Sequence, residues 1–245
     1  MVRTTMSDVL DPRVNSLLAR LPRREQEAVT DGCELVPLNV GVTLCMPEDT
    51  IEHVYFPVDS YISLITPAGG TESLEVGMVG NEGMFGATLL LGVEVAAFRG
   101  LVQGGGAALR MSAKRFARAL RQQENFHRMI DRYMFVLMTQ LAQTAACTRF
   151  HLLDARLARW LLMTHDRAHS NTFRITHEFL AYMLGVRRAG VTEAAGRLQA
   201  RGLIRYSRGR LAVLDRAGLE AVTCPCYGII KDHYIKHIGR ARATG

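Results

Sequence analysis

Arginine side chains gather in the last third of the chain, where their guanidinium groups could bind an anionic partner. Arg187 and Arg188 are adjacent, and Arg205, Arg208 and Arg210 follow within a short segment. A guanidinium carries five donors in a rigid fork, so it pairs well with phosphate oxygens and with the O6 and N7 acceptors of guanine. These residues predict recognition of a polyanion.

Charge is distributed unevenly along the chain. Residues 1–148 hold 13 basic and 16 acidic residues, whereas residues 149–245 hold 17 basic and 7 acidic residues. The formal net charge of the whole chain is +7 at pH 7. A polyanion such as DNA would therefore be attracted to the second part of the chain and not to the first.

Two short helices joined by a tight turn are predicted over residues 176–199. Thr176 is placed to cap the first helix, and Gly185 can adopt the left-handed backbone of the turn. The second helix is expected from about Arg187 to Arg201. Helical spacing predicts that three of its apolar residues point inward: Val191, Ala195 and Leu198.

A basic β-hairpin is predicted over residues 203–214, directly after the second helix. Together they predict a winged helix-turn-helix, whose second helix enters the DNA major groove. The helix residues would read base edges, and the wing residues would bind phosphates. The residues expected to contact DNA are Thr176, Arg187, Arg188, Thr192, Glu193, Arg197, Arg205, Arg208 and Arg210.

The first half of the chain has a different pattern. Two short helices are expected over residues 14–30, with Val14 in the first and Pro22 at the start of the second. Seven short β-like runs follow, separated by glycines and prolines, and they predict a β-roll or barrel. The runs are Glu34–Leu38, Val42–Cys45, His53–Phe56, Tyr61–Thr66, Thr71–Val76, Arg99–Gln103 and Ala107–Met111.

Helices are predicted to connect the β region to the helix-turn-helix. Ser112 is expected to cap one helix, a long helix should cover about residues 125–149, and another should cover Leu153–Arg167. Asp215 is expected to cap a helix after the hairpin, followed by a helical, basic tail.

The long helix is apolar around much of its girth, so it must be covered on more than one side. One side can pack on the β region and the other on the same helix of a second subunit, although the periodicity also fits a core helix of a monomer. We predict a dimer interface formed by Phe126, Ile130, Tyr133, Leu137 and Leu141.

This order of elements resembles the Crp/Fnr family of bacterial transcription regulators. The resemblance covers about residues 14–235 and is most specific over residues 176–204. It implies an α+β fold with three parts: a sensor β-roll similar to a cyclic-nucleotide-binding domain over 14–122, a dimerisation helix over 123–150 and a winged helix-turn-helix over 151–235. It also implies a homodimer that binds a palindromic promoter site and acts with RNA polymerase.

Departures from the family pattern affect both functional regions. Arg188 takes the position of a family arginine that contacts guanine. Ala189 and Glu193, however, replace a family glutamate and a family arginine. The DNA sequence of the operator should therefore differ from the one that the family pattern recognises. The candidate effector residues in the roll are Gly80, Asn81, Glu82, Gly83 and Arg99.

A cyclic nucleotide is not expected in the roll. Family members that bind cyclic AMP use a Gly-Glu pair and an Arg-Ser pair, whereas here Asn81 follows Gly80 and the second pair is replaced by Ala96-Ala97-Phe98-Arg99. Shifting Arg99 by one residue would turn its side chain to the other face of the strand. No other cofactor is identified.

Other classes of protein find little support in the sequence. No catalytic motif is present, so we expect no enzyme. Five scattered cysteines predict no disulfide framework, and Cys224-Pro225-Cys226 has too short a spacing to predict a metal site. Met1–Asp11 resembles no signal peptide and no apolar run could cross a membrane, which predicts a cytoplasmic protein. A ligand-binding module whose helix-turn-helix serves protein contacts remains the alternative.

Overall fold

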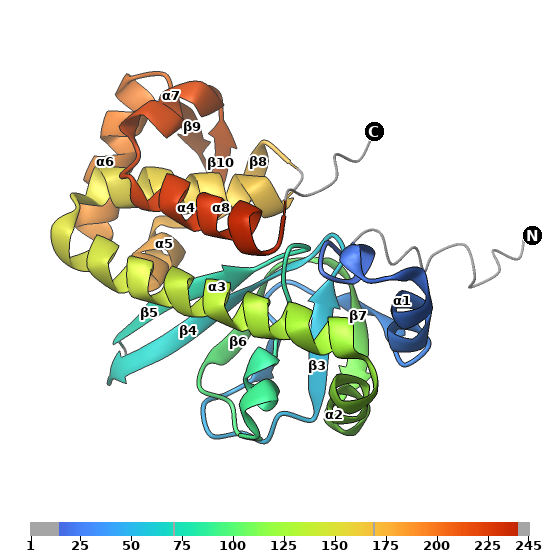
Figure 1. Ribbon diagram of the computed structural model, residues 1–245. Helices are drawn as coiled ribbons and strands as arrows, with labels where there is room; N and C mark the ends of the chain where they lie inside the picture. The colour runs from blue at the N-terminus through green and yellow to red at the C-terminus, as the bar shows by residue number, and fades with distance from the viewer. Residues whose placement is uncertain (1–14, 71, 169, 240–245) are drawn as a thin grey trace, which may run out of the picture.

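The computed structural model describes residues 15–70, 72–168 and 170–239 (Figure 1). The expectations for Met1–Asp11, Val14 and Thr71 fall outside these residues. The fold is of the α+β class: an N-terminal roll of antiparallel sheets, a long helix that crosses it, and a C-terminal helical unit with a small sheet. The described residues include no helix that is long and apolar enough to cross a membrane.

All seven predicted strands of the roll are confirmed. They form two antiparallel sheets, with strand orders β1-β7-β3 and β2-β6-β4-β5. Their buried side chains alternate with exposed ones along β1, which is the pattern of a sheet with one face on a core. The strands are β1 (Glu34–Leu38), β2 (Thr43–Cys45), β3 (His53–Pro57), β4 (Tyr61–Gly69), β5 (Glu72–Val79), β6 (Arg99–Gly104) and β7 (Gly106–Ser112).

The first predicted helix is wrong, because only the short 3-10 turn η3 (Leu18–Arg20) forms there before α1 (Arg23–Thr30). Asn15 explains the difference. Its side-chain oxygen accepts hydrogen bonds from two backbone N–H groups just after it, and its amide nitrogen donates to carbonyls of Pro57 and Gly83 at 3.0 Å. These bonds tie the segment to the roll and compete with a regular helix.

Two helices follow the roll, and a further 3-10 turn, η4 (Ala87–Leu91), lies within it. The Ser112 hydroxyl accepts a hydrogen bond from the Arg115 N–H and caps α2 (Ala113–Gln122), as predicted. The long helix α3 (Glu124–Phe150) then runs across the roll and on to the C-terminal unit (Figure 1).

The prediction of a dimer interface on α3 is wrong for most of its residues. Four of the five residues are buried inside the chain: Phe126, Ile130, Tyr133 and Leu137. Phe126 packs against the rings of Phe56 and Phe116, and the Tyr133 hydroxyl donates to the Met84 carbonyl at 3.0 Å. The periodicity marks an apolar face correctly, but that face covers the chain's own roll. Leu141 is partly buried.

The outer face of α3 carries a different apolar stripe. Phe135 is 48% exposed and Met138 is 59% exposed, and Ala142 and Ala145 continue the stripe as exposed residues. Their spacing of three, four and three residues is that of a helix-pairing seam.

In its described residues, the C-terminal unit has five helices and three short strands. Asp215 accepts a hydrogen bond from the Gly218 N–H and caps α7, as predicted. Strand β8 was not predicted, and it completes a sheet of order β8-β10-β9. The elements are α4 (Leu153–Ala168), β8 (Thr172–Arg174), α5 (His177–Leu184), α6 (Arg188–Ala200), β9 (Ile204–Ser207), β10 (Arg210–Val213), α7 (Arg216–Val222) and α8 (Cys226–His237).

The two faces of α3 should respond differently to truncation. Phe126→Ala should lower the free energy of unfolding by about 3–5 kcal/mol, because it opens a cavity in the core. Met138→Ala, on the exposed stripe, should change it by less than about 0.5 kcal/mol when measured at protein concentrations low enough to keep the chain monomeric. Urea unfolding followed by circular dichroism measures both. Equal losses for the two variants would contradict this assignment of faces.

Candidate nucleic-acid interface

Helix α5 and helix α6 meet at a tight turn whose geometry follows from two residues. The Thr176 hydroxyl accepts a hydrogen bond from the Phe179 N–H at 3.0 Å and starts α5. Gly185 ends α5 in the left-handed region at φ 61°, where a side chain would be strained. Arg187 is the N-cap of α6, so the predicted start of the second helix is confirmed within one residue.

The two faces of α6 differ sharply. Its inner face packs on α4 and α5, and the three residues predicted to point inward are buried. The outer face exposes Arg187, Arg188 and Thr192 near the N-terminal end of the helix. Among the described residues, neither of these two arginines forms an ion pair with a carboxylate, so both guanidinium groups are available to a ligand.

Other predicted DNA contacts on α6 already have partners in the chain. Arg197 forms a bidentate ion pair with Asp154, with both N···O distances at 2.7 Å, and Glu193 lies 3.8 Å from the same guanidinium. The Thr192 hydroxyl donates to the Arg188 carbonyl and lies 2.9 Å from His177 Nδ1. These contacts fix the outer face but leave Arg197 less free than the sequence predicted.

His177 joins the two helices to the wing, a role that the sequence analysis missed. Its ring stacks on Tyr206 of β9, with centroids 4.3 Å apart. Burial lowers the pKa of His177, and the nearby Arg188 guanidinium lowers it further. Tyr206 also donates to the Ile175 carbonyl at 2.7 Å, which holds the wing against the start of α5.

The outward face of the wing is strongly basic. In each strand the alternate residues point away from the core, and Arg208 occupies the hairpin tip with φ 49°. Part of this face is a groove of about 510 Å³, lined by Thr172, Arg205, Ser207, Arg208, Arg210 and Ala212. Arg174 on β8 pairs in register with Arg210 and is also exposed. Arg174 was not among the predicted DNA contacts because strand β8 was not predicted.

Comparison with known proteins identifies this part of the chain. Residues 155–222 match the family model of the Crp-like helix-turn-helix domain. This region is a Crp-like helix-turn-helix domain. No curated protein sequence matches the chain.

Solved structures show that the Crp-like domain and the roll together have the fold of Crp/Fnr regulators. A protein from Eubacterium rectale assigned to the Crp/Fnr transcriptional regulators is 16% identical, has a TM-score of 0.67, and the match covers 84% of this chain and 96% of that one. A CRP-family transcriptional regulator from Thermus thermophilus is 17% identical, with a TM-score of 0.64 and coverage of 76% and 95%.

A third structure is the c-di-GMP-responsive global regulator CLP of Xanthomonas campestris. It is 14% identical, with a TM-score of 0.65, and the match covers 78% of this chain and 99% of that one. At such low identity these likenesses concern the fold.

The Crp-like domain is docked on the roll through α5. The Tyr182 carbonyl accepts a hydrogen bond from Ser73 at 3.5 Å, and the Tyr182 hydroxyl accepts one from Arg99 at 3.3 Å. Glu75 of β5 is buried at the same junction. Burial raises its pKa to about 7, against the opposing influence of Ser63 and the Arg159 guanidinium.

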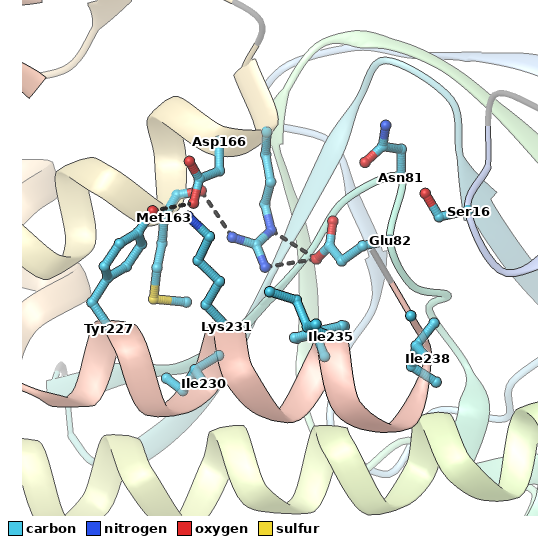
Figure 2. A pocket seen from close by; sticks show the side chains of 13 residues that line it. Ser16, Asn81, Glu82, Met163, Asp166, Tyr227, Ile230, Lys231, Ile235 and Ile238 are labelled. Carbon is cyan, nitrogen blue, oxygen red and sulfur yellow. Dashed lines mark hydrogen bonds and ion pairs between the residues drawn. The ribbon is translucent and has the colours of Figure 1, made fainter. Parts of the chain in front are cut away.

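Two of the predicted effector residues line a pocket beside the Crp-like domain. Asn81 and Glu82 lie at one wall, and α8 supplies the apolar opposite wall (Figure 2). The pocket has a volume of about 490 Å³, which is within the range of small-molecule sites. Glu82 forms a buried ion pair with Arg167 of α4 at 2.6 Å, and the Gly80 N–H donates to the same carboxylate at 3.2 Å.

The remaining predicted effector residues do not join this pocket. Gly83 packs directly on the Tyr133 ring, where a side chain would not fit. Arg99 donates to the Thr43 hydroxyl at 3.0 Å and to Tyr182, so it belongs to the docking contact. Inside the roll, the chamber between η4 and α3 has a volume of only about 20 Å³ and is lined in part by Phe85 and Phe98.

Proposed function

We propose that this protein is a transcription regulator that binds promoter DNA through α6 and the wing. The observation that carries the proposal is the unpaired, exposed Arg187-Arg188 pair at the start of α6, whose inner face is locked into the Crp-like domain. An arginine in that position can form bidentate hydrogen bonds with guanine, and the wing arginines can bind the flanking phosphates.

The proposal includes a homodimer and a palindromic site. The exposed stripe of Phe135, Met138, Ala142 and Ala145 gives α3 a surface that a second copy of α3 could cover. Pairing by a two-fold axis presents two α6 helices, so the half-sites should lie about 10 base pairs apart or a multiple of that distance. RNA polymerase is the further partner that a promoter-bound regulator would contact.

The roll is the signal-sensing part of the proposal, and we propose that its signal is not a cyclic nucleotide. The chamber beneath η4 is too small, Glu82 is paired with Arg167, and Arg99 is engaged by Thr43 and Tyr182. The groups that would hold a ribose and a cyclic phosphate are thus committed elsewhere. The pocket of Figure 2 offers space for a different small molecule.

Removing the arginine pair should abolish sequence-specific binding. Arg187→Ala/Arg188→Ala should weaken binding to a palindromic duplex, selected by the unsubstituted protein, by roughly 30-fold or more, because each of the two guanine contacts contributes about 1–3 kcal/mol. Fluorescence anisotropy with labelled duplex measures the affinity at fixed salt.

A matched control keeps the change in charge the same. Lys114→Ala/Arg121→Ala removes two exposed cations from α2, far from the Crp-like domain (Figure 1), and should leave the affinity within about twofold. Undiminished binding by the Arg187/Arg188 variant would show that α6 does not contact the DNA. Failure of the unsubstituted protein to select any duplex would favour the alternative, in which the helix-turn-helix serves protein contacts.

Cyclic nucleotides should not stabilise the protein. A ligand at about 100 times its Kd adds about 2.7 kcal/mol to the free energy of unfolding, which is several degrees in Tm. Differential scanning fluorimetry should show the same Tm with cyclic AMP, cyclic GMP and the matched non-cyclic AMP and GMP. A rise confined to either cyclic nucleotide would overturn this part of the proposal.

A further inference from the structure

Four side chains that can bind metals converge where α3 ends and α8 begins. They come from two places far apart in the sequence, and each potential ligand atom lies within 4.8 Å of the others. We call them the Cys3His cluster: Cys147, His151, Cys224 and Cys226. All three cysteines are free thiols and are almost completely buried.

The distances within the Cys3His cluster suit a single tetrahedral ion. Sulfur ligands lie about 2.3 Å and nitrogen ligands about 2.0 Å from Zn²⁺, so neighbouring ligand atoms are roughly 3.5–3.8 Å apart. Here the Sγ atoms of Cys147 and Cys224 are 3.5 Å apart, and Cys226 Sγ is 3.4 Å from His151 Nδ1. All four potential ligand atoms lie within 4.8 Å of one another.

Positively charged groups lie around the Cys3His cluster. Cys226 is the first residue of α8, where the N-terminal end of the helix dipole is positive. The guanidinium groups of Arg156 and Arg159 are buried beside the cluster and interact electrostatically with its thiols, and neither forms an ion pair with a carboxylate among the described residues. A complex of one divalent ion with three thiolates has a net negative charge, which these cations would balance.

A hydrogen-bond donor on α3 also reaches the Cys3His cluster. The Gln143 amide lies on α3, one turn before Cys147, and donates to Cys226 Sγ at 3.1 Å. Such a second layer of donors typically orients the ligands of a metal site.

We propose that the Cys3His cluster binds one Zn²⁺ ion and that the ion is structural. Three thiolates and one imidazole are a common donor set for structural zinc, and full burial of the cysteines leaves no open position for a substrate. An iron–sulfur cluster fits less well, because each iron takes its own terminal ligand and the ligating sulfurs would lie further apart.

The ion would join α3 to the Crp-like domain. His151 directly follows α3, and only two residues separate α3 from α4. A bond network from this point to the start of α8 would restrict rotation of the Crp-like domain about that connection. This consequence for DNA binding rests on the proposed function, whereas zinc binding itself does not.

Metal content tests the proposal directly. Protein purified without metals or chelators should contain one zinc per chain by inductively coupled plasma mass spectrometry. Cys224→Ser and His151→Ala should lower zinc affinity at least 10- to 100-fold, measured by competition with a chromogenic chelator. The matched control Cys33→Ser, a cysteine outside the cluster, should retain one zinc.

A second measurement covers variants that fail to fold. Zinc can be withdrawn from the unsubstituted protein and replaced by Co²⁺, which should produce thiolate-to-cobalt charge-transfer bands and the ligand-field bands of a tetrahedral site. Absence of those bands, or a Cys147–Cys224 disulfide in metal-free protein purified without oxygen, would overturn the proposal.

The effect on DNA is measured separately from the metal. Withdrawal of zinc should weaken binding to the selected duplex at least tenfold, and stoichiometric Zn²⁺ should restore it. If the protein holds zinc but the zinc-loaded form binds no DNA, the proposed function fails and the metal site stands. If DNA binding is normal in protein shown to lack the site, the zinc proposal fails and the function stands.

Discussion

The fold depends on a single helix that must be covered along most of its length. Helix α3 has apolar residues around so much of its circumference that no one neighbour can bury them all. The roll covers one face through Phe126, Ile130 and Tyr133, and α8 covers another near its end. Buried Gln140 fixes its position, because its amide bonds both the N–H and the carbonyl of Met78 on β5. Helix α3 therefore fixes the position of the Crp-like domain relative to the roll.

The orientation of the proposed recognition helix follows from contacts made some distance from it. Helix α5 is held on β5 by Ser73, and α4 is held on the roll by the buried pair of Arg167 and Glu82. A buried ion pair of this kind costs desolvation energy, but it loses much more when one partner is removed, so it specifies one docking geometry. Helix α6 inherits its direction from α4 and α5, on which its inner face packs.

Local signals in the sequence were enough to predict most elements. Alternating runs between glycines and prolines predicted all seven strands of the roll, and Ser112, Thr176 and Asp215 were correctly predicted as helix caps because capping depends on residues only three positions away. Periodicity could not predict which element packs against an apolar helix face. Phe126 and Tyr133 do belong to an apolar face. The local sequence, however, does not show whether that face packs against the same chain or against a second subunit.

In the functional sites too, local spacing predicted some features, whereas others depend on tertiary packing. The exposure of Arg187 and Arg188 follows from helical spacing, but the bidentate pairing of Arg197 with Asp154 depends on how α4 packs on α6. The Cys3His cluster was missed for a similar reason. Cys224-Pro225-Cys226 alone has a weak spacing, and its companions on α3 become neighbours only when α8 folds back along that helix. Strand β8, which contains Arg174, was not predicted because a strand of three residues is too short to show an alternating pattern.

The proposed function requires that the Crp-like domain of the ligand-free protein reads DNA sequence. Selection of the purified, ligand-free protein against a random duplex library, at two salt concentrations, tests it most directly. We expect a palindrome to be enriched, with half-sites about one helical turn apart, and this enrichment should persist at the higher salt concentration. Binding that is sequence-blind and disappears at the higher salt concentration would contradict it, because phosphate contacts alone would then explain the interaction.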